Sequence, residues 1–328
     1  MSTTSNFNNE RVNEDTLIAR YFAPLATHAG ARGLLDDAAL VSVPEGSELV
    51  VTLDTLVEGV HFRKTDPADL IARKALRVNL SDLAAKGAKP HSYFLSLGLN
   101  KNWSEDWIAR FVSGLKSDQE EFGLSLFGGD TTMSPGPLTI SITAMGLVDK
   151  GKMVARYNAR AGDMVFITGT IGDAALGLQV ESTHNPSDAF LQQRYLLPEP
   201  RTGLVDALAT YANAAMDISD GLLGDLQKMC LASGVGASIE RNKIPLSLAA
   251  QEWLLRSQDI WDKILIGGDD YEILAAVPGM NVTKFVDAAR VAGIDVTWLG
   301  QFEKTGGIRL SENGNQLILP TTMSYSHF

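Results

Sequence analysis

The sequence predicts a mixed α/β (α+β) protein with two domains, and three observations lead to this prediction. The chain has 328 residues, and a single domain commonly contains about 100–200 residues. Apolar residues make up 45% of the chain and charged residues 20%, which is typical of a globular protein. Helical and strand-like hydrophobic patterns alternate in both halves. We expect a disordered tail at 1–12, followed by domains at 13–150 and 151–328.

The first half contains both kinds of pattern. Asn13 or Thr16 is placed to cap a short helix that ends near residue 27. Two longer helical patterns cover 67–86 and 104–122. Apolar runs between turn residues predict strands at 38–43, 49–53, 124–127 and 138–148. We expect the third of these strands to end in a glycine turn at 128–129.

The second half repeats the alternation. Apolar runs predict strands at 164–168, 214–216 and 271–277, with further short strands near the C-terminus. Helical patterns follow residue 172 and cover about 187–197, 202–211, 222–232 and 283–292. Because strands and helices mix in both halves, neither an all-helical nor an all-β fold is expected.

The charge balance narrows the class of partner. The chain has 28 Lys and Arg against 39 Asp and Glu, which gives a net charge of −11 at pH 7. Nucleic acid is not expected as a partner, since binding its phosphates requires a basic face. A nucleotide remains compatible with the acidic balance, because divalent metal ions can lie between carboxylates and phosphates.

Further features concern the compartment and the nucleotide-binding motifs. Cys230 is the only cysteine, so no internal disulfide forms and a reducing cytoplasm is expected. The polar N-terminus and the lack of a long apolar run predict neither a signal peptide nor a membrane span. The sequence contains no GxxxxGK[ST] loop and no complete GxGxxG motif, which excludes a P-loop and disfavours a dinucleotide-binding fold.

Aspartates recur at the ends of apolar segments. Five share this placement: Asp37, Asp54, Asp130, Asp217 and Asp269. For any one of them, a role in a turn or a helix cap is the simpler interpretation. Together they indicate a ligand site, because strand ends tend to converge on one side of a sheet.

Asp82 stands out within the helical pattern at 67–86. It belongs to a stripe at spacings of three and four whose other members are apolar: Ile71, Ala75, Val78 and Ala85. Burying an unpaired carboxylate is very costly. Asp82 therefore needs a metal cation, a water-filled cleft or, as the equally good alternative, a Lys or Arg partner.

The segment 217–221 brings two carboxylates and the Ser219 hydroxyl together before a helix. These closely spaced oxygens suit Mg²⁺, although helix capping explains them as well. Arg156, near the domain junction, is a candidate phosphate ligand whose alternative is a surface ion pair. His61 is kept as a candidate because it follows Asp54 within the same segment.

Six motifs in order resemble the thiamine-monophosphate kinase family, and the resemblance covers about residues 15–328. The motifs are DDAA at 36–39, TLDTLVEGVHF at 52–62, VNLSDLAA at 78–85, GGDTT at 128–132, MDISDG at 216–221 and GDDYE at 268–272. This family is part of the aminoimidazole-ribonucleotide synthetase-like superfamily, whose members bind ATP without a P-loop.

The resemblance implies a fold and a reaction. The fold is the two-domain fold of the superfamily, in which the N-terminal domain forms the interface of a homodimer. The reaction is direct transfer of the γ-phosphate of ATP to thiamine monophosphate, which yields thiamine diphosphate and ADP. ATP is the co-substrate and several Mg²⁺ ions hold its phosphates. No residue is implied as a catalytic base, since the acceptor is itself an anionic phosphate.

The resemblance also implies site residues. Metal ligands are Asp37, Thr52, Asp54, Asp82, Asp130, Asp217 and Asp220. Contacts to ATP are Gly129, Asp130, Arg156 and Ser219, and contacts to thiamine monophosphate are His61, Asp269 and Tyr325. The sequence departs from the family pattern at Leu35, Leu53, Asp269 and Ser326, where the family usually has Gly, a hydroxyl residue, Glu and Asp.

Two alternatives stay open. The first is another ATP-using synthetase of the same superfamily, although the segment from Asp54 to His61 speaks against the purine-pathway member. The second is a non-catalytic protein that binds divalent cations. It would explain the carboxylates but not Arg156 or His61.

Overall fold

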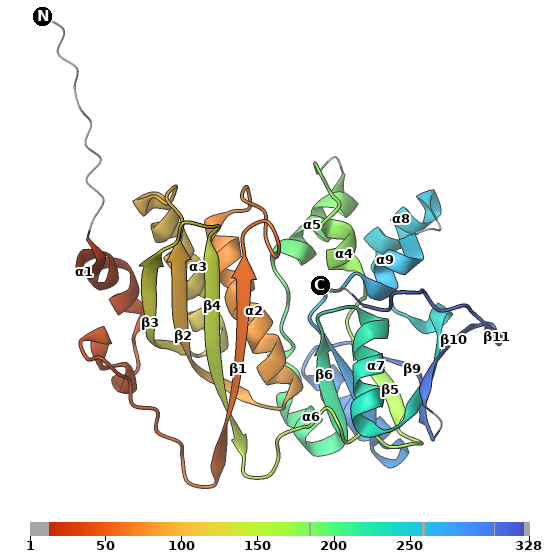
Figure 1. Ribbon diagram of the computed structural model, residues 1–328. Coiled ribbons are helices and arrows are strands. Elements are labelled where there is room, and N and C mark those ends of the chain that lie inside the picture. Colours follow the sequence, from red (N-terminus) through yellow and green to blue (C-terminus); the bar gives the residue numbers. More distant parts are fainter. Residues whose placement is uncertain (1–12, 184, 258–259, 305, 325–328) are drawn as a thin grey trace, which may run out of the picture.

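The structure is a computed structural model that describes residues 13–183, 185–257, 260–304 and 306–324. Two β-sheets lie side by side, each covered by helices (Figure 1). This is the mixed α/β arrangement expected from the alternating patterns. We propose to divide the chain at 150/151, between the last strand of the first sheet and the first strand of the second. No helix within the described ranges has both the length and the apolar character of a membrane span.

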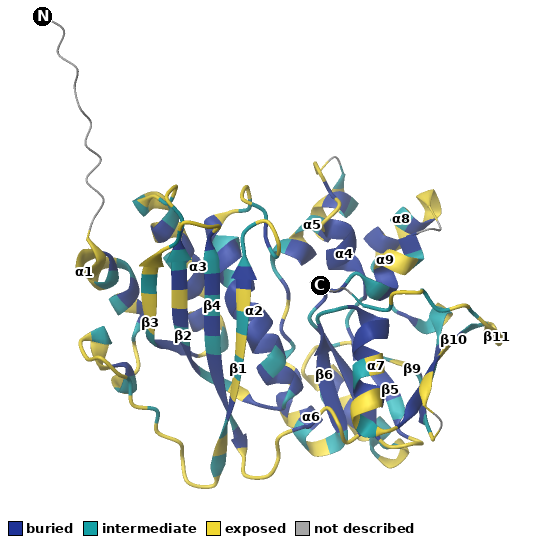
Figure 2. Cartoon of the chain, viewed as in Figure 1, coloured by how far each residue is buried: buried dark blue, intermediate teal, exposed yellow. Residues whose placement is uncertain are grey.

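The first sheet has four strands in the order β1-β4-β2-β3. They are β1 (Ser47–Val57), β4 (Thr139–Asp149), β2 (Lys89–Leu99) and β3 (Ser125–Met133). Only the β2–β3 pair is parallel. Helices α2 (Ala68–Ala85) and α3 (Glu105–Phe122) pack on one face, and both confirm the helical patterns. The other face bears exposed side chains, so burial alternates along the strands (Figure 2).

The start of the chain is partly as predicted. Asn13 caps α1 (Glu14–Leu17), with its side chain accepting a hydrogen bond from Thr16 N at 2.9 Å. The helical path then continues as the short turns η1 (Ile18–Phe22) and η2 (Ala23–Leu25), followed by η3 (Ala29–Leu34). The strand predicted at 38–43 is wrong. Leu40 N donates to Gly30 O, which ties this segment to η3, and the Leu40 side chain stays 56% exposed.

The predicted glycine turn at 128–129 is also wrong, because β3 runs straight through it. The pairing with β2 shifts between Tyr93 and Phe94, which forms a β-bulge. A Cβ on Gly129 would lie 1.9 Å from Leu95 O, and one on Gly128 would lie 2.9 Å from the Phe94 ring. The glycines therefore permit close approach of two strands instead of a turn.

The second sheet has seven strands in the order β11-β10-β7-β9-β5-β8-β6. They are β5 (Met164–Thr168), β6 (Ala214–Ile218), β7 (Gly236–Glu240), β8 (Glu272–Val277), β9 (Val296–Glu303), β10 (Gly307–Glu312) and β11 (Asn315–Gln316). The helices are α4 (Asp173–Gly177), α5 (Pro186–Leu196), α6 (Val205–Tyr211), α7 (Leu222–Ser233), α8 (Leu248–Arg256), α9 (Trp261–Ile266) and α10 (Val282–Val291).

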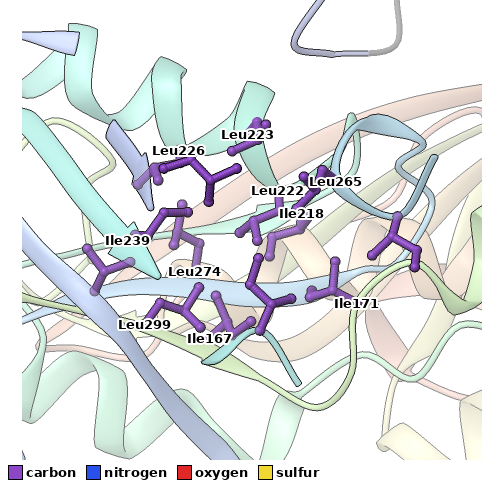
Figure 3. Packing of buried hydrophobic residues seen from close by; sticks show 14 of the residues in the cluster. Ile167, Ile171, Ile218, Leu222, Leu223, Leu226, Ile239, Leu265, Leu274 and Leu299 are labelled. Carbon is purple, nitrogen blue, oxygen red and sulfur yellow. The ribbon is translucent and has the colours of Figure 1, made fainter. Parts of the chain in front are cut away.

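One core cluster joins β6, β8 and β9 to α7 and α9 (Figure 3). A second cluster, on α6 and α10, also includes Ala84 and Ala85 of α2. Helix α2 thus packs against both halves of the molecule.

Candidate active site

Strand β1 and helix α2 bring three of the candidate metal ligands together. Thr52 and Asp54 alternate with exposed residues along β1 and face the helix side of the sheet. Thr52 Oγ1 donates to Asp82 Oδ2 at 2.5 Å. Asn79, one turn earlier on α2, accepts a hydrogen bond from Asp54 N at 3.1 Å. The carboxylate inside the apolar stripe therefore lies against the strand that carries the other two ligands.

The second domain adds carboxylates from the end of β6. Asp217 is the buried penultimate residue of this strand, and Ser219 and Asp220 follow in the loop before α7. The loop is shaped by Asp225, whose fully buried Oδ2 accepts hydrogen bonds from Ser219 N and Asp220 N, both at 2.9 Å. Gly221 has φ +100°, and a Cβ there would lie 2.6 Å from the Ile266 backbone, so no other residue fits well.

The carboxylates from the two domains act on one another. Burial raises the pKa of Asp54 to about 6, and the charges of Asp82 and Asp220 contribute to the rise. Burial also raises the pKa of Asp217 well above its usual range, again with a contribution from Asp82. Like charges held this close disfavour ionisation. We refer to Asp54, Asp82, Asp217 and Asp220 as the acidic cluster.

Three cationic side chains border the acidic cluster. Lys86 Nζ donates to Ala215 O at 2.8 Å, and burial lowers its pKa against the opposing charges of Asp217 and Asp82. The charge of Arg156 also lowers the pKa of Lys86, so the guanidinium approaches from the segment before β5. Lys228 forms an ion pair with Asp220 and a 2.7 Å pair with Asp225. The capping alternative for this segment is wrong, because Gly221 is the N-cap of α7 and no side chain in the described part of the chain caps the helix; Asp220 instead pairs with Lys228.

The remaining candidate ligands lie on the opposite face of the first sheet. Asp130 is exposed and pairs in register with Ser96, which alternates with buried residues along β2. Asp37, Gly129 and Asp130 line a cavity of about 610 Å³ on this face, together with Leu53. The structure therefore separates the seven predicted ligands into two groups. It also explains the departure at Leu53, whose side chain is 59% exposed and faces away from Thr52 and Asp54.

The acidic cluster has the composition of a site for a hard cation. Carboxylate and hydroxyl oxygens are the ligands that Mg²⁺ prefers, and Thr52 supplies a hydroxyl beside Asp82. Across the described ranges, no three acidic, His or Cys side chains already enclose an ion position. The oxygen ligands of the acidic cluster therefore suit Mg²⁺, and they would have to move closer together to coordinate it.

The predicted substrate contacts meet at a different place. His61 accepts a hydrogen bond at Nδ1 from Val57 N at 3.0 Å, which orients its ring in the loop after β1. Asp269, before β8, has φ +66° and its Oδ2 lies 2.5 Å from Lys74 Nζ. Lys74 Nζ also donates to His61 O at 3.2 Å. Tyr325 lies outside the described residues.

Sequence reasoning missed Lys74, Asp225 and Tyr271. Lys74 had a detectable signal, since it precedes Val78 by four residues and Asp82 by eight on the same helical stripe. Asp225 had none, because its partners are backbone amides of the preceding loop. Burial raises the pKa of Tyr271 well above its usual range, as do the charges of Asp269, Asp54 and Asp217, and its phenol hydrogen-bonds the Asp269 carboxylate.

Comparisons with known proteins identify the family of this chain. The family model "AIR synthase related protein, N-terminal domain" matches residues 35–148. The corresponding C-terminal domain model matches residues 160–312. The thiamine-monophosphate kinase of Caulobacter vibrioides is 39% identical over 315 residues, covering 94% of this chain and 89% of that protein.

Solved structures give the same result. The crystal structure of thiamine-monophosphate kinase from Stenotrophomonas maltophilia superposes with a TM-score of 0.79 at 38% identity, covering 87% of this chain and 91% of that one. The structure of AaThiL complexed with AMPPCP and TMP superposes with a TM-score of 0.77 at 31% identity, covering 89% and 91%. This chain belongs to the thiamine-monophosphate kinase family of the AIR synthase-related proteins.

Proposed function

We propose that this protein transfers the γ-phosphate of ATP to thiamine monophosphate and releases thiamine diphosphate and ADP. The observation that carries this function is the acidic cluster, which gathers carboxylates of both domains beside Arg156 and Lys86. Bare carboxylates repel a triphosphate, so the cluster is useful to ATP only through metal ions. The relative AaThiL was solved with the ATP analogue AMPPCP and with TMP.

We propose Mg²⁺ as the metal and the predicted ligands as its site. Thr52, Asp54, Asp82, Asp217 and Asp220 would hold ions between the domains, and Asp37 and Asp130 would hold a separate ion at the open face. Such ions neutralise phosphate charge during transfer. Asp220 would exchange part of its ion pair with Lys228 for the metal.

The side chains of this chain bind and orient the two substrates. Arg156 and Ser219 would contact ATP beside the acidic cluster, and Arg156 would stabilise charge on the transferred group. Gly129 and Asp130 are also proposed as ATP contacts, at the open face with the separate ion. His61, Asp269 and Tyr325 would contact thiamine monophosphate, where the Asp269 carboxylate suits a cationic ring. No base is needed, because the acceptor oxygen already carries negative charge. We also propose a cytoplasmic location, supported by the single buried thiol of Cys230.

We further propose a homodimer formed through the open face of the first sheet. Val51 and Leu53 lie on this face and are 55% and 59% exposed, and an exposed apolar sheet face favours a self-complementary partner. Leu53→Lys is expected to convert the dimer to a monomer in light scattering of the eluted protein. A wild-type protein that is already monomeric at micromolar concentration would contradict the homodimer.

The kinase function is tested by incubating the purified protein with thiamine monophosphate, ATP and MgCl₂. Thiamine diphosphate is oxidised to its fluorescent thiochrome and quantified after chromatography. We expect stoichiometric formation of thiamine diphosphate and ADP. Metal binding with no transfer under any metal or pH condition would favour the non-catalytic alternative. Formation of ADP without thiamine diphosphate would favour another synthetase of the superfamily.

A further inference from the structure

Lys74 is a buried cation at the junction of three segments. It lies on α2, and its side chain is only 3% exposed. A buried ammonium must be paired, since an isolated charge in the interior is very unfavourable. Its partners are Asp269 Oδ2 at 2.5 Å, His61 O at 3.2 Å and the ring of Tyr195, whose centroid is 3.9 Å away.

Each of these partners belongs to a different part of the chain. His61 is in the loop after β1, Asp269 is in the loop before β8, and Tyr195 is in α5. The Tyr195 hydroxyl donates to the same carbonyl, His61 O, at 3.4 Å. The guanidinium of Arg63 also lies over the Tyr195 ring, 5.1 Å from its centroid. One ammonium therefore fixes the first-domain loop and the second-domain loop relative to each other.

The loop around Asp269 needs such a constraint. Asp269 and Tyr271 both have positive φ, at +66° and +51°, and a non-glycine residue in this region is held only by its surroundings. Asp269 N donates to Ser219 O at 2.8 Å, which fixes the backbone but not the carboxylate. Lys74 engages Oδ2, the Tyr271 phenol hydrogen-bonds the same carboxylate, and the Asp269 side chain remains 29% exposed.

We propose that Lys74 is a positioning residue for the thiamine-phosphate site, an inference that rests on the proposed function. It binds no substrate itself. It aligns Asp269 with His61 across the two domains, so that one carboxylate oxygen faces the cationic ring of the vitamin. Because ATP is held elsewhere, loss of this alignment affects the affinity for thiamine monophosphate and leaves that for ATP unchanged.

The test is steady-state kinetics of Lys74→Met with each substrate varied in turn. We expect the KM for thiamine monophosphate to rise at least about tenfold while the KM for ATP changes less than about twofold. Arg77→Met is the matched control, because Arg77 is also buried on α2 but pairs with Asp118 and Glu121. It is expected to lower the melting temperature without changing either KM.

A double-mutant cycle with Asp269→Asn separates a positioning role of Lys74 from a role in general stability. If Lys74→Met alone folds poorly, the double variant also removes the carboxylate charge that Lys74→Met leaves unpaired. Compared with Asp269→Asn alone, the double variant is expected to show a KM for thiamine monophosphate that is higher by less than about twofold. An equal effect in both backgrounds, or an unchanged KM in folded Lys74→Met, would overturn the inference. A wild-type protein that forms no thiamine diphosphate would instead overturn the proposed function.

Discussion

Two aspartates associated with helix α2 have opposite surroundings. Asp118 is fully buried on α3, and α2 surrounds it with guanidinium groups from Arg73 at 2.7 Å and Arg77 at 2.8 and 2.9 Å. Asp82 lies on α2 itself, and it accepts a hydrogen bond from the Thr52 hydroxyl. The charges that act around Asp82 are the carboxylates of Asp54 and Asp217 and the single ammonium of Lys86.

This difference distinguishes a structural carboxylate from a functional one. Where the chain supplies its own cations, as around Asp118, the charge is neutralised inside the fold, and removing one partner is strongly destabilising. Where carboxylates outnumber the protein cations beside them, as in the acidic cluster, an external cation would relieve the remaining repulsion. Glu272 repeats the first case in the second domain, since it is fully buried and pairs with Arg194 and Arg201.

The largest expected effect is on turnover in Asp82→Asn. The substitution keeps the shape of the side chain but removes a charge that would hold a metal ion, so we expect kcat to fall by at least about 10³-fold. The melting temperature should stay level or rise, because repulsion within the acidic cluster decreases. Circular dichroism and thermal melting verify the fold, and wild-type turnover with a normal Mg²⁺ requirement would remove Asp82 from the site.

Asp118→Asn is expected to show the reverse pattern. It leaves Arg73 and Arg77 without their buried partner, which costs about 3–5 kcal/mol of unfolding free energy. The kcat of the folded fraction should remain close to that of the wild type. Urea unfolding followed by fluorescence gives the free energy, and a stable but inactive variant would contradict the assignment of Asp118 to structure alone.

The two variants should also differ in their response to magnesium. A ligand that binds only the folded state at about 100 times its Kd stabilises it by about 2.7 kcal/mol. We expect MgCl₂ with AMPPCP to raise the melting temperature of the wild type and of Asp118→Asn. In Asp82→Asn this increase should be absent. An equal increase in all three proteins would place the metal away from Asp82.

The smallest effect concerns Cys230, which reports on the fold in both variants. Burial raises the pKa of this thiol to about 11. At pH 8 only roughly one thiol in a thousand is then ionised, so modification by a disulfide reagent should be slow. The wild type and Asp82→Asn should react equally slowly, and Asp118→Asn faster through opening of the fold. Rapid modification of the native wild type would contradict the burial of Cys230.

The sequence was most informative where a residue acts through its own segment. Helices α2 and α3 were predicted within a residue or two at most ends, because stripe spacing and a capping residue such as Ser104, the N-cap of α3, are local signals. Asp82 was identified because its charge interrupts an apolar stripe. The grouping of the aspartates was not predictable, since it depends on which face of β1 and β3 each residue occupies and on a β-bulge next to Gly128.

Two sequence features had a meaning that only tertiary contacts reveal. The glycines at 128–129 suggest a turn locally but serve the close pairing of β3 with β2. The stripe marks Lys74 as a residue of the buried helix face, but its partners lie 13 and 195 positions away in the chain. Such long-range partners leave no local pattern in one sequence.

The central claim is that the acidic cluster binds the metal that carries ATP. Its most direct test is calorimetric titration of Mg²⁺ into the wild type and Asp82→Asn, each in the presence of AMPPCP, with Asp118→Asn as the control. We predict that Asp82→Asn loses at least one of the ions bound by the wild type, while Asp118→Asn retains all of them. Identical stoichiometry and affinity in Asp82→Asn and the wild type would contradict the claim.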